Sequence, residues 1–396
     1  MFATVFKRLS VLLAPVFILS ACSTVDVSDT TDEPPSAQTP TTRAQVSFTQ
    51  RTWADTPALE VSNWPKALEA LKQSCPRMTA KKEWTTVCQI AQMTPSSQAQ
   101  SFFRSHFTPW QVSASTLPTG AGLMTGYYEP LLRGSRVRHG AYQYPLYSVP
   151  DDLIIVDLAS LYPQLKGMRL RGKLEGRKLV PYDSRKEIDT RKDLNSKAIV
   201  WVDDEIAAFF LQIQGSGRIR LPDGSMVRVG YADQNGHRYQ SVGTWLIRQG
   251  ELKSHEASMQ GIQAWARRNP GRVKTMLEQN PSYVFFEERQ GDPNLGPLGA
   301  QGVPLTPEAS VAVDRSYWQL GTIFLVDVTQ SNPSLHMTKT VIAQDTGGAI
   351  RGPIRFDYFW GFGDDAGAKA GRQKSAARAW VLMPNGYTPT STLTQH

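Results

Sequence analysis

Two aspartates near the C-terminal end of the chain stand where an acid is costly to keep. Asp345 follows the apolar run Val341-Ile342-Ala343, at the expected end of a strand, and precedes Thr-Gly-Gly. Asp357 lies within the aromatic stretch 356–360. Aspartate is depleted in strands, and a carboxyl among apolar side chains loses hydration unless it is paired or used. Such surroundings raise a carboxyl pKa from about 3.9, as a general acid near neutral pH requires.

Both aspartates also have a structural interpretation. Asp345 could accept hydrogen bonds from turn amides, because the glycines at 347 and 348 favour a turn there. For Asp357 that interpretation is weaker, since a turn aspartate seldom stands between bulky aromatic residues. Asp364 and Asp365 are rivals for the acid, and both are read as turn residues. We therefore expect Asp357 to be the proton donor and Asp345 to be its catalytic partner.

Further motifs accompany the aspartates in a fixed order. They are Thr125-Gly126-Tyr127-Tyr128-Glu129-Pro130, Gln214-Gly215-Ser216-Gly217, the run 231–237 (YADQNGH), the run 279–286 (QNPSYVFF), and the aspartates Asp314, Asp345 and Asp357. From about Trp53 to the end, this ordered set resembles the membrane-bound lytic murein transglycosylase A (MltA) family. That family closes with a three-aspartate domain.

The resemblance implies a mainly β fold with some α. It predicts a double-psi β-barrel, a second and smaller inserted β-barrel-like domain, and a groove between them that holds a long polymer. The catalytic barrel with its N-terminal helices would comprise 48–128 and 288–396, and the three-aspartate region would span 310–385. The inserted domain would comprise 129–287, with a helical segment at 241–279.

The resemblance also implies an activity. A peptidoglycan lytic exotransglycosylase cleaves the β-1,4 bond between N-acetylmuramic acid and N-acetylglucosamine without water, and leaves 1,6-anhydro ends during cell-wall turnover. Asp357 and Asp345 would be catalytic. The substrate-binding residues would be Asp314, Thr125, Tyr128, Gln214, Gly215 and Ser216. Composition alone leaves core packing open for Thr125 and Tyr128, and a hairpin turn open for 214–217; the choice between endo and exo attack also stays open.

The N-terminus has the pattern of a lipoprotein signal, residues 1–21. Lys7-Arg8 precede an apolar run from Leu9 to Leu19, which is shorter than the roughly 20 residues of a spanning helix. The sequence Leu-Ser-Ala-Cys resembles a lipobox in which Cys22 is acylated, and Ser23 resembles sorting to the outer membrane, facing the periplasm. Residues 22–47, rich in Ser, Thr and Pro, predict a flexible tether. Ordinary secretion is the alternative.

The charge and the histidine and cysteine content limit the partners, cofactors and cross-links that can be expected. The net charge of +8 falls to +6 without Lys7 and Arg8, but the cations are scattered and no nucleic-acid motif occurs. The expected partners are peptidoglycan glycan strands, the outer membrane through the anchor, and other murein synthases or hydrolases. No cofactor and no metal is expected, since the six histidines lack metal-ligand spacing. Cys75 and Cys88 could form a disulfide or remain buried thiols.

Three other interpretations compete with this one. Asp345-Thr346-Gly347 resembles an aspartic-protease signature, which needs two such aspartates that share a proton. The sequence holds one copy, so a protease would have to be a dimer. A non-catalytic wall-binding lipoprotein would bind sacculi and release no product. The run 361–366 imitates a dinucleotide loop, but no helix is expected after it and no acid follows Asp365.

Periodicity and breakers predict the elements that position these residues. Helices broken at Pro76 and Pro95 are expected over 63–107. Strands are expected at 123–128, 142–149, 198–202, 206–214, 218–229, 283–286, 310–313, 322–328, 339–343, 356–360 and 377–383. The acidic run 203–205 is read as a solvated turn, 290–306 as a connector and 367–375 as a loop.

Overall fold

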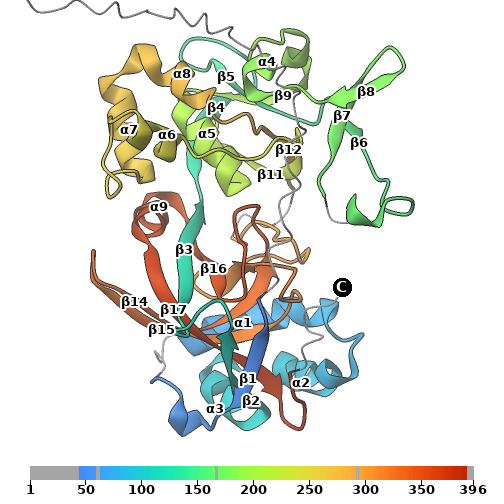
Figure 1. Ribbon diagram of the computed structural model, residues 1–396, viewed down its shortest axis with the longest axis vertical. Helices are drawn as coiled ribbons and strands as arrows, with labels where there is room; N and C mark the ends of the chain where they lie inside the picture. The colour runs from blue at the N-terminus through green and yellow to red at the C-terminus, as the bar shows by residue number, and fades with distance from the viewer. Residues whose placement is uncertain (1–43, 59–62, 166–167, 291, 293, 390–396) are drawn as a thin grey trace, which may run out of the picture. The chain divides into compact units, whose positions relative to one another are not determined.

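The computed structural model describes residues 44–58, 63–165, 168–290, 292 and 294–389 (Figure 1). The predicted signal peptide, Cys22 and most of the predicted tether lie outside these residues. Strand β1 (Val46–Gln50) begins within the last residues assigned to the tether, so that prediction ran slightly too far. No helix in the described ranges combines the length and apolarity that a bilayer span requires.

The segment after β1 is helical, as predicted. It comprises α1 (Asn63–Ser74), α2 (Lys82–Met93) and α3 (Ala99–His106), and a 3-10 turn with Pro76 in its first turn ends α1. Cys75 and Cys88 form a disulfide that joins this turn to α2. The apolar faces of the three helices pack in one cluster with residues of β14, β15 and β17, including the buried Trp380.

A closed ring of strands carries the three aspartates. Its members in order are β17 (Lys374–Pro384), β14 (Ile323–Gln330), β15 (Leu335–Asp345), β13 (Ser310–Val313), β16 (Arg355–Phe362) and β3 (Gly122–Glu129). Because β3 also pairs with β17, these strands close on themselves. β2 (Phe107–Ala114) joins the outer edge of β17 and carries β1. The predicted strands of this region are confirmed.

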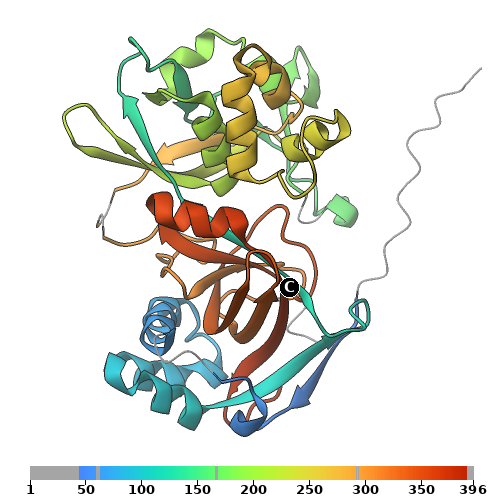
Figure 2. The same ribbon diagram turned by 90° about the vertical axis from the view of Figure 1, so that its left-hand side faces the viewer.

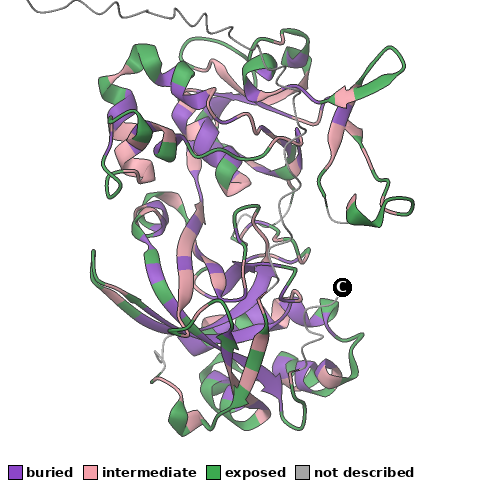
Figure 3. Ribbon diagram, in the orientation of Figure 1, coloured by how far each residue is buried: buried purple, intermediate pink, exposed green. Residues whose placement is uncertain are grey.

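The interior of the ring is apolar. Figure 3 shows these strands largely in purple, the colour of buried residues. Alternate residues point inward: Met124 on β3, Val311 and Val313 on β13, and Phe356 and Tyr358 on β16 share one core cluster. The residues between them face outward, and these include Asp357. Asp345 follows an irregularity in the pairing of β13 with β15 and accepts a hydrogen bond from the outward-facing Tyr127.

One prediction in this region was wrong. Residues 363–372, expected to include a loop from 367, form helix α9 (Gly363–Arg372), which lies beside β3 and β16 (Figure 2). Glycines suggest a loop because they weaken helices. Here they permit close packing: a Cβ on Gly367 would lie 2.8 Å from the Tyr128 ring, and one on Gly371 would lie 2.6 Å from the Gln260 amide.

A second sheet lies in the residues between β3 and β13. Its strands in order are β12 (Val284–Glu288), β11 (Met226–Gln234), β10 (Ser216–Arg220), β4 (Leu131–Ser135), β9 (Ala198–Val202) and β5 (Tyr144–Tyr147). The predicted strand at 198–202 and the hairpin around 222–224 are confirmed. Helices α6 (Val242–Arg248), α7 (Met259–Arg268) and α8 (Val273–Leu277) match the predicted helical segment.

The segment 206–214 is not the strand that was predicted. It forms helix α5 (Glu205–Gln214), and Asp204 caps it by accepting hydrogen bonds from the amides of Ile206 and Ala207. The acidic run 203–205 is therefore a helix start rather than only a solvated turn. Seven of the ten side chains of α5 are apolar, so a buried helix and a buried strand are hard to distinguish from the pattern.

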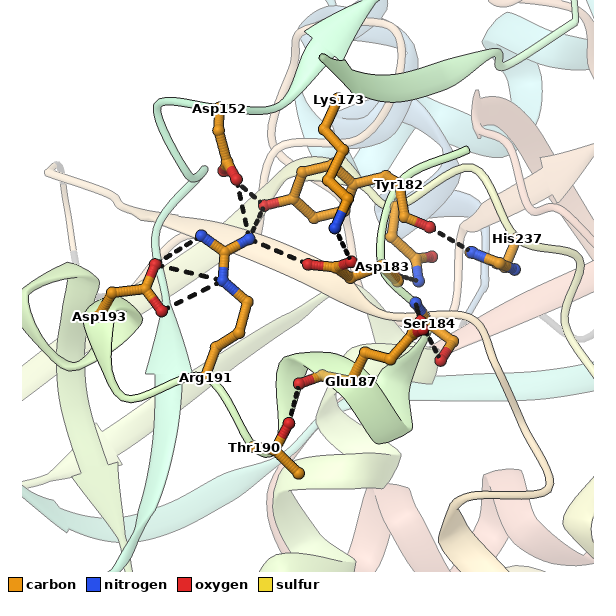
Figure 4. Close-up of polar contacts among 11 residues, drawn as sticks. Asp152, Lys173, Tyr182, Asp183, Ser184, Glu187, Thr190, Arg191, Asp193 and His237 are labelled. Carbon is orange, nitrogen blue, oxygen red and sulfur yellow. Dashed lines mark hydrogen bonds and ion pairs between the residues drawn. The ribbon is translucent and has the colours of Figure 1, made fainter. Parts of the chain in front are cut away.

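A small three-stranded sheet of β6 (Ile154–Ile155), β7 (Arg171–Glu175) and β8 (Lys178–Pro181) is tied down by ion pairs. Lys173 pairs with Asp183, and Arg191 pairs with Asp152, Asp183 and Asp193 (Figure 4). With the two larger sheets and the helices, this gives a β-rich, mixed fold.

Candidate active site

The two predicted catalytic aspartates lie in one row across the strands of the ring. In register, Asp345 on β15 stands beside Ala312 on β13, Ala312 beside Asp357 on β16, and Asp357 beside Thr125 on β3. Neighbouring strands are about 4.8 Å apart, so the Cα atoms of the two aspartates are about 10 Å apart. Ala312 stands between them, and because its side chain is small, no bulky group separates the two carboxyls.

The row faces the outside of the ring. Thr125 and Tyr127 alternate with the inward Met124, and Asp357 alternates with the inward Phe356 and Tyr358. On the outer face, Tyr127, Leu305, Ala312, Ile350 and Phe359 form a separate apolar cluster. The carboxyls are thus embedded beside apolar groups while remaining half-buried rather than sealed.

The Asp357 carboxyl has the properties of a proton donor. Thr125 Oγ1 donates to Oδ1 at 2.6 Å, whereas Oδ2 accepts from none of the described residues. The pKa of Asp357 is raised to about 6, chiefly by burial and also by the nearby Asp345 charge, while the Thr125 hydrogen bond and the Arg355 charge oppose this rise. One oxygen is therefore oriented and the other is available to a substrate.

Asp345 is held on both sides. Its Oδ1 accepts from the Ala300 amide at 3.0 Å, and its Oδ2 accepts from the Tyr127 hydroxyl at 2.9 Å. Burial raises the pKa of Asp345, and these hydrogen bonds oppose the rise. The hydroxyl and the amide fix the carboxyl in place, which suits a group that stabilises charge better than one that moves a proton.

The structure also excludes a protease dyad formed by Asp345 and Asp357 of one chain. A proton-sharing pair of aspartates needs carboxyls about 3 Å apart. Here a whole strand, β13, lies between Asp345 and Asp357, and Asp345 Oδ2 is bonded to Tyr127. Within the described chain this arrangement does not match an aspartic-protease dyad.

Asp314 lies at the end of β13 and is 4% exposed. Its Oδ1 accepts from the amide and hydroxyl of Ser316, and its Oδ2 accepts from the Gly352 amide at 2.8 Å. The carboxyl therefore joins two loops that flank the row. Its predicted contact with sugar stays a prediction.

Tyr128 and Gln214 meet on the other side of β3. Gln214 Oε1 accepts from the Tyr128 amide at 3.1 Å, and both residues line a cavity of about 180 Å³ with Phe210, Tyr239 and Met259. Burial raises the pKa of Tyr128 to about 12. Because Gly126 and Tyr128 alternate with Thr125 and Tyr127, this cavity lies across β3 from the carboxyl row.

The Gln-Gly-Ser-Gly motif is a helix end rather than a hairpin turn. Gly215 caps α5 with φ of +79°, a backbone conformation that favours glycine, and Ser216 begins β10. Gln214 joins α5 to β3 by its hydrogen bond with Tyr128. Saccharide binding by Gln214, Gly215 and Ser216 stays a prediction.

Sequence reasoning missed three polar side chains on the outer face. Tyr127 binds Asp345, and Arg355 Nη1 donates to Thr125 Oγ1 at 3.0 Å, which in turn donates to Asp357. Lys374 stands opposite Thr125 on β17. The period of two was the available signal: Tyr127 is two residues from Thr125, and Arg355 is two residues from Asp357.

Comparison with known proteins accords with this architecture. The family model of the MltA-specific insert domain matches residues 123–287, and that of the 3D domain matches 309–383. A crystal structure of MltA from Neisseria gonorrhoeae is 37% identical, with a TM-score of 0.77 over 88% of this chain and 95% of that one. A structure of Escherichia coli MltA with bound chitohexaose is 28% identical, with a TM-score of 0.67 over 85% and 94%.

A relative found by sequence comparison belongs to the same family, and its match covers a shorter part of the chain. Membrane-bound lytic murein transglycosylase A of Escherichia coli K12 is 35% identical over 265 residues, which are 65% of this chain and 64% of that protein. The match thus spans just under two thirds of the relative's length. The two matched domains define a 3D-domain protein that carries an MltA-specific insert. The chain belongs to the MltA family of lytic murein transglycosylases.

Proposed function

We propose that this protein is a lytic transglycosylase that cleaves the β-1,4 bond between N-acetylmuramic acid and N-acetylglucosamine in peptidoglycan. The observation that carries the proposal is the Asp357 carboxyl, with a raised pKa, one oxygen held by Thr125 and one oxygen available. A glycan-bound relative, E. coli MltA with chitohexaose, supports an oligosaccharide substrate.

One carboxyl accounts for both proton transfers. Asp357 donates its proton to the glycosidic oxygen as the bond from that oxygen to C1 breaks. The 6-hydroxyl of the same muramic residue then bonds to C1, and its proton passes to Asp357. No water is consumed, the acid is regenerated, and the product is a 1,6-anhydro end.

Asp345 would stabilise the positive charge that develops at C1. Glycosidases that use water or a covalent intermediate need a second carboxylate free to act as base or nucleophile. Asp345 has both oxygens engaged, with Tyr127 and Ala300, so it is poorly placed for either task. This favours attack by the sugar's own hydroxyl.

The product identifies the reaction class. Purified protein incubated with sacculi should release muropeptides that are lighter by one water than those from a hydrolase digest, as measured by mass spectrometry. Products of full hydrolytic mass would show a glycosidase instead. Binding to sacculi with no product would support the wall-binding lipoprotein.

We also propose a fold and a domain organisation for this enzyme. The ring of strands would be a double-psi β-barrel formed by 48–128 and 288–396, with 129–287 inserted. Its parallel pairings, β13 with β15 and β16 with β3, within an otherwise antiparallel ring support this. The glycan would lie in a groove along the outer face that carries Asp357.

We also propose attachment to the outer membrane through an acylated Cys22, facing the periplasm. The lipobox pattern supports it, and the curated relatives are named membrane-bound. Replacing Cys22 with serine should move the protein from the membrane fraction to the soluble periplasmic fraction. Unchanged fractionation would refute the anchor.

A further inference from the structure

The outer face of the ring carries two cationic side chains that the proposed reaction does not use. Arg355 precedes Asp357 by two residues on β16, so the two side chains share a face. Lys374 on β17 stands in register with Thr125 on β3, and cross-strand neighbours point to the same side. The row therefore runs from acids on β15 and β16 to a cation on β17, and Arg355 lies beside it.

Arg355 keeps part of its guanidinium free. Its Nη1 donates to Thr125 Oγ1 at 3.0 Å and to the Phe356 carbonyl oxygen. Its Nε and Nη2 donate to none of the described residues, and neither is among the buried polar atoms that lack a partner. Burial lowers the pKa of Arg355, but an arginine stays charged in proteins. A planar edge of N–H donors is thus open beside the acid.

Lys374 is the second cation. It is exposed, and it forms no ion pair with any residue that the structure describes. Only its backbone is engaged, through an amide that donates to Gln330. Its ammonium group can therefore reach toward a ligand on the same face without giving up an existing partner.

This pair suits one feature of the substrate. A muramic residue differs from N-acetylglucosamine by a lactyl ether that ends in a carboxyl group. In naked glycan that group is a free carboxylate, and in peptide-bearing glycan it is an amide, but the peptide carries carboxylates of its own. Guanidinium edges bind carboxylates through two parallel hydrogen bonds, and an ammonium adds charge.

We propose that Arg355 and Lys374 form an anion subsite that binds a carboxylate of the muramic residue at the cleaved bond. The subsite would distinguish murein from glycans made of N-acetylglucosamine alone. This proposal rests on the proposed function. Arg355 also donates a hydrogen bond to the Thr125 hydroxyl, which in turn orients Asp357. Binding of the carboxylate by Arg355 would therefore be coupled to the position of Thr125.

The test separates anion recognition from a merely structural role. In the inactive Asp357→Asn protein, binding of chitohexaose and of a naked muramic-containing glycan is measured by calorimetry. Arg355→Gln and Lys374→Gln should each weaken the muramic glycan about tenfold and change chitohexaose by less than about twofold. Equal losses for both glycans, or no loss for either, would overturn the subsite.

Controls keep the test decisive. Arg177→Gln removes the same charge from an exposed arginine in the turn between β7 and β8 and should leave both affinities unchanged. If Arg355→Gln fails to fold, Lys374→Gln alone decides, because that side chain is exposed. Since the readout is binding, failure of the subsite is distinct from failure of the proposed function, which the product masses of the wild-type protein report.

The source of the carboxylate follows from a second pair of ligands. Naked glycan and peptide-bearing glycan are compared in the same variants. A loss confined to naked glycan assigns the lactyl carboxylate alone, and a loss for both glycans shows that the subsite also accepts a carboxylate of the peptide. Either result supports an anion subsite.

Discussion

Replacing Asp357 with asparagine will lower the release of anhydro-muropeptides by about 100- to 10,000-fold, the usual contribution of one general acid–base group. Asparagine keeps the shape and can still accept from Thr125, but it has no acidic proton to transfer. The measurement is the rate of product release from sacculi. Turnover near that of the wild type would remove Asp357 from the mechanism.

Asp365→Asn is the matched control. This exposed acid lies in the first turn of α9 and was a rival for the catalytic position. The same chemical change there should leave turnover unaltered. A large loss in this variant, with Asp357→Asn still active, would move the acid from β16 to α9.

The wild-type rate should fall as pH rises through about 6. The reaction needs the protonated acid, and with a pKa of about 6 roughly one tenth of the Asp357 carboxyls are protonated at pH 7. Above that pKa, the rate should drop by about tenfold per pH unit. A rate that is flat between pH 6 and 8 would contradict a single donor at this position.

The asparagine variant should also be more stable than the wild type at neutral pH. A carboxyl whose folded pKa exceeds its unfolded value opposes folding when ionised; the cost is absent below the unfolded pKa and complete above about 6. For this half-buried group the gain is on the order of 1–3 kcal/mol. Melting temperatures at pH 7.5 and 4 test it, and the gain should vanish at pH 4.

Glu129→Gln should cost about 3–5 kcal/mol of stability, the usual result of removing one partner of a buried ion pair. Glu129, at the end of β3, is 1% exposed and accepts from Arg218 Nε on β10 at 2.8 Å. The same guanidinium lies 4.1 Å from the centre of the Phe362 ring on β16. The variant leaves Arg218 buried without its carboxylate.

Urea unfolding measures this cost, and Glu288→Gln is its control. Glu288 pairs with Arg136 at 2.7 Å, but both side chains are about one third exposed or more. Removing an exposed pair should cost less than about 1 kcal/mol. If the two variants lost equal stability, the buried pair would have no special role.

Asp357 could be proposed as the acid from the sequence because the conflict between its charge and its surroundings is local. An aspartate among Phe356, Tyr358 and Phe359 contradicts strand chemistry wherever the strand lies. Its partners could not be found in the same way, since Thr125 and Asp357 are 232 positions apart and meet only through β3–β16 pairing. Tyr127 and Arg355 have the same difficulty, because their roles depend on which face of a strand looks outward.

The two helices that were not predicted, α5 and α9, show which information the local sequence pattern does not contain. In α5 the apolar side chains surround the whole helix, so no 3.6-residue stripe is visible, although the cap at Asp204 was a usable signal. In α9 the glycines at 363, 367 and 371 lower helix propensity. Contact with Tyr128 and Gln260 explains Gly367 and Gly371, whereas Gly363 adopts a positive φ of +83° at the start of the helix. The dinucleotide-loop interpretation was rejected partly for want of a helix that is in fact present; the missing acid still opposes it.

The alternation of β3 limits how this strand can change over time. Thr125 and Tyr127 look toward the carboxyls, while Gly126 and Tyr128 look the other way. A single inserted or deleted codon between Gly122 and Thr125 would reverse every one of these directions. A deletion would bring Gly126 opposite Asp357, and an insertion would bring Met124 there. This part of β3 can therefore vary by substitution but not by a change in length. A one-residue shift in strand register would remove both the Thr125 hydrogen bond to Asp357 and the Tyr127 hydrogen bond to Asp345.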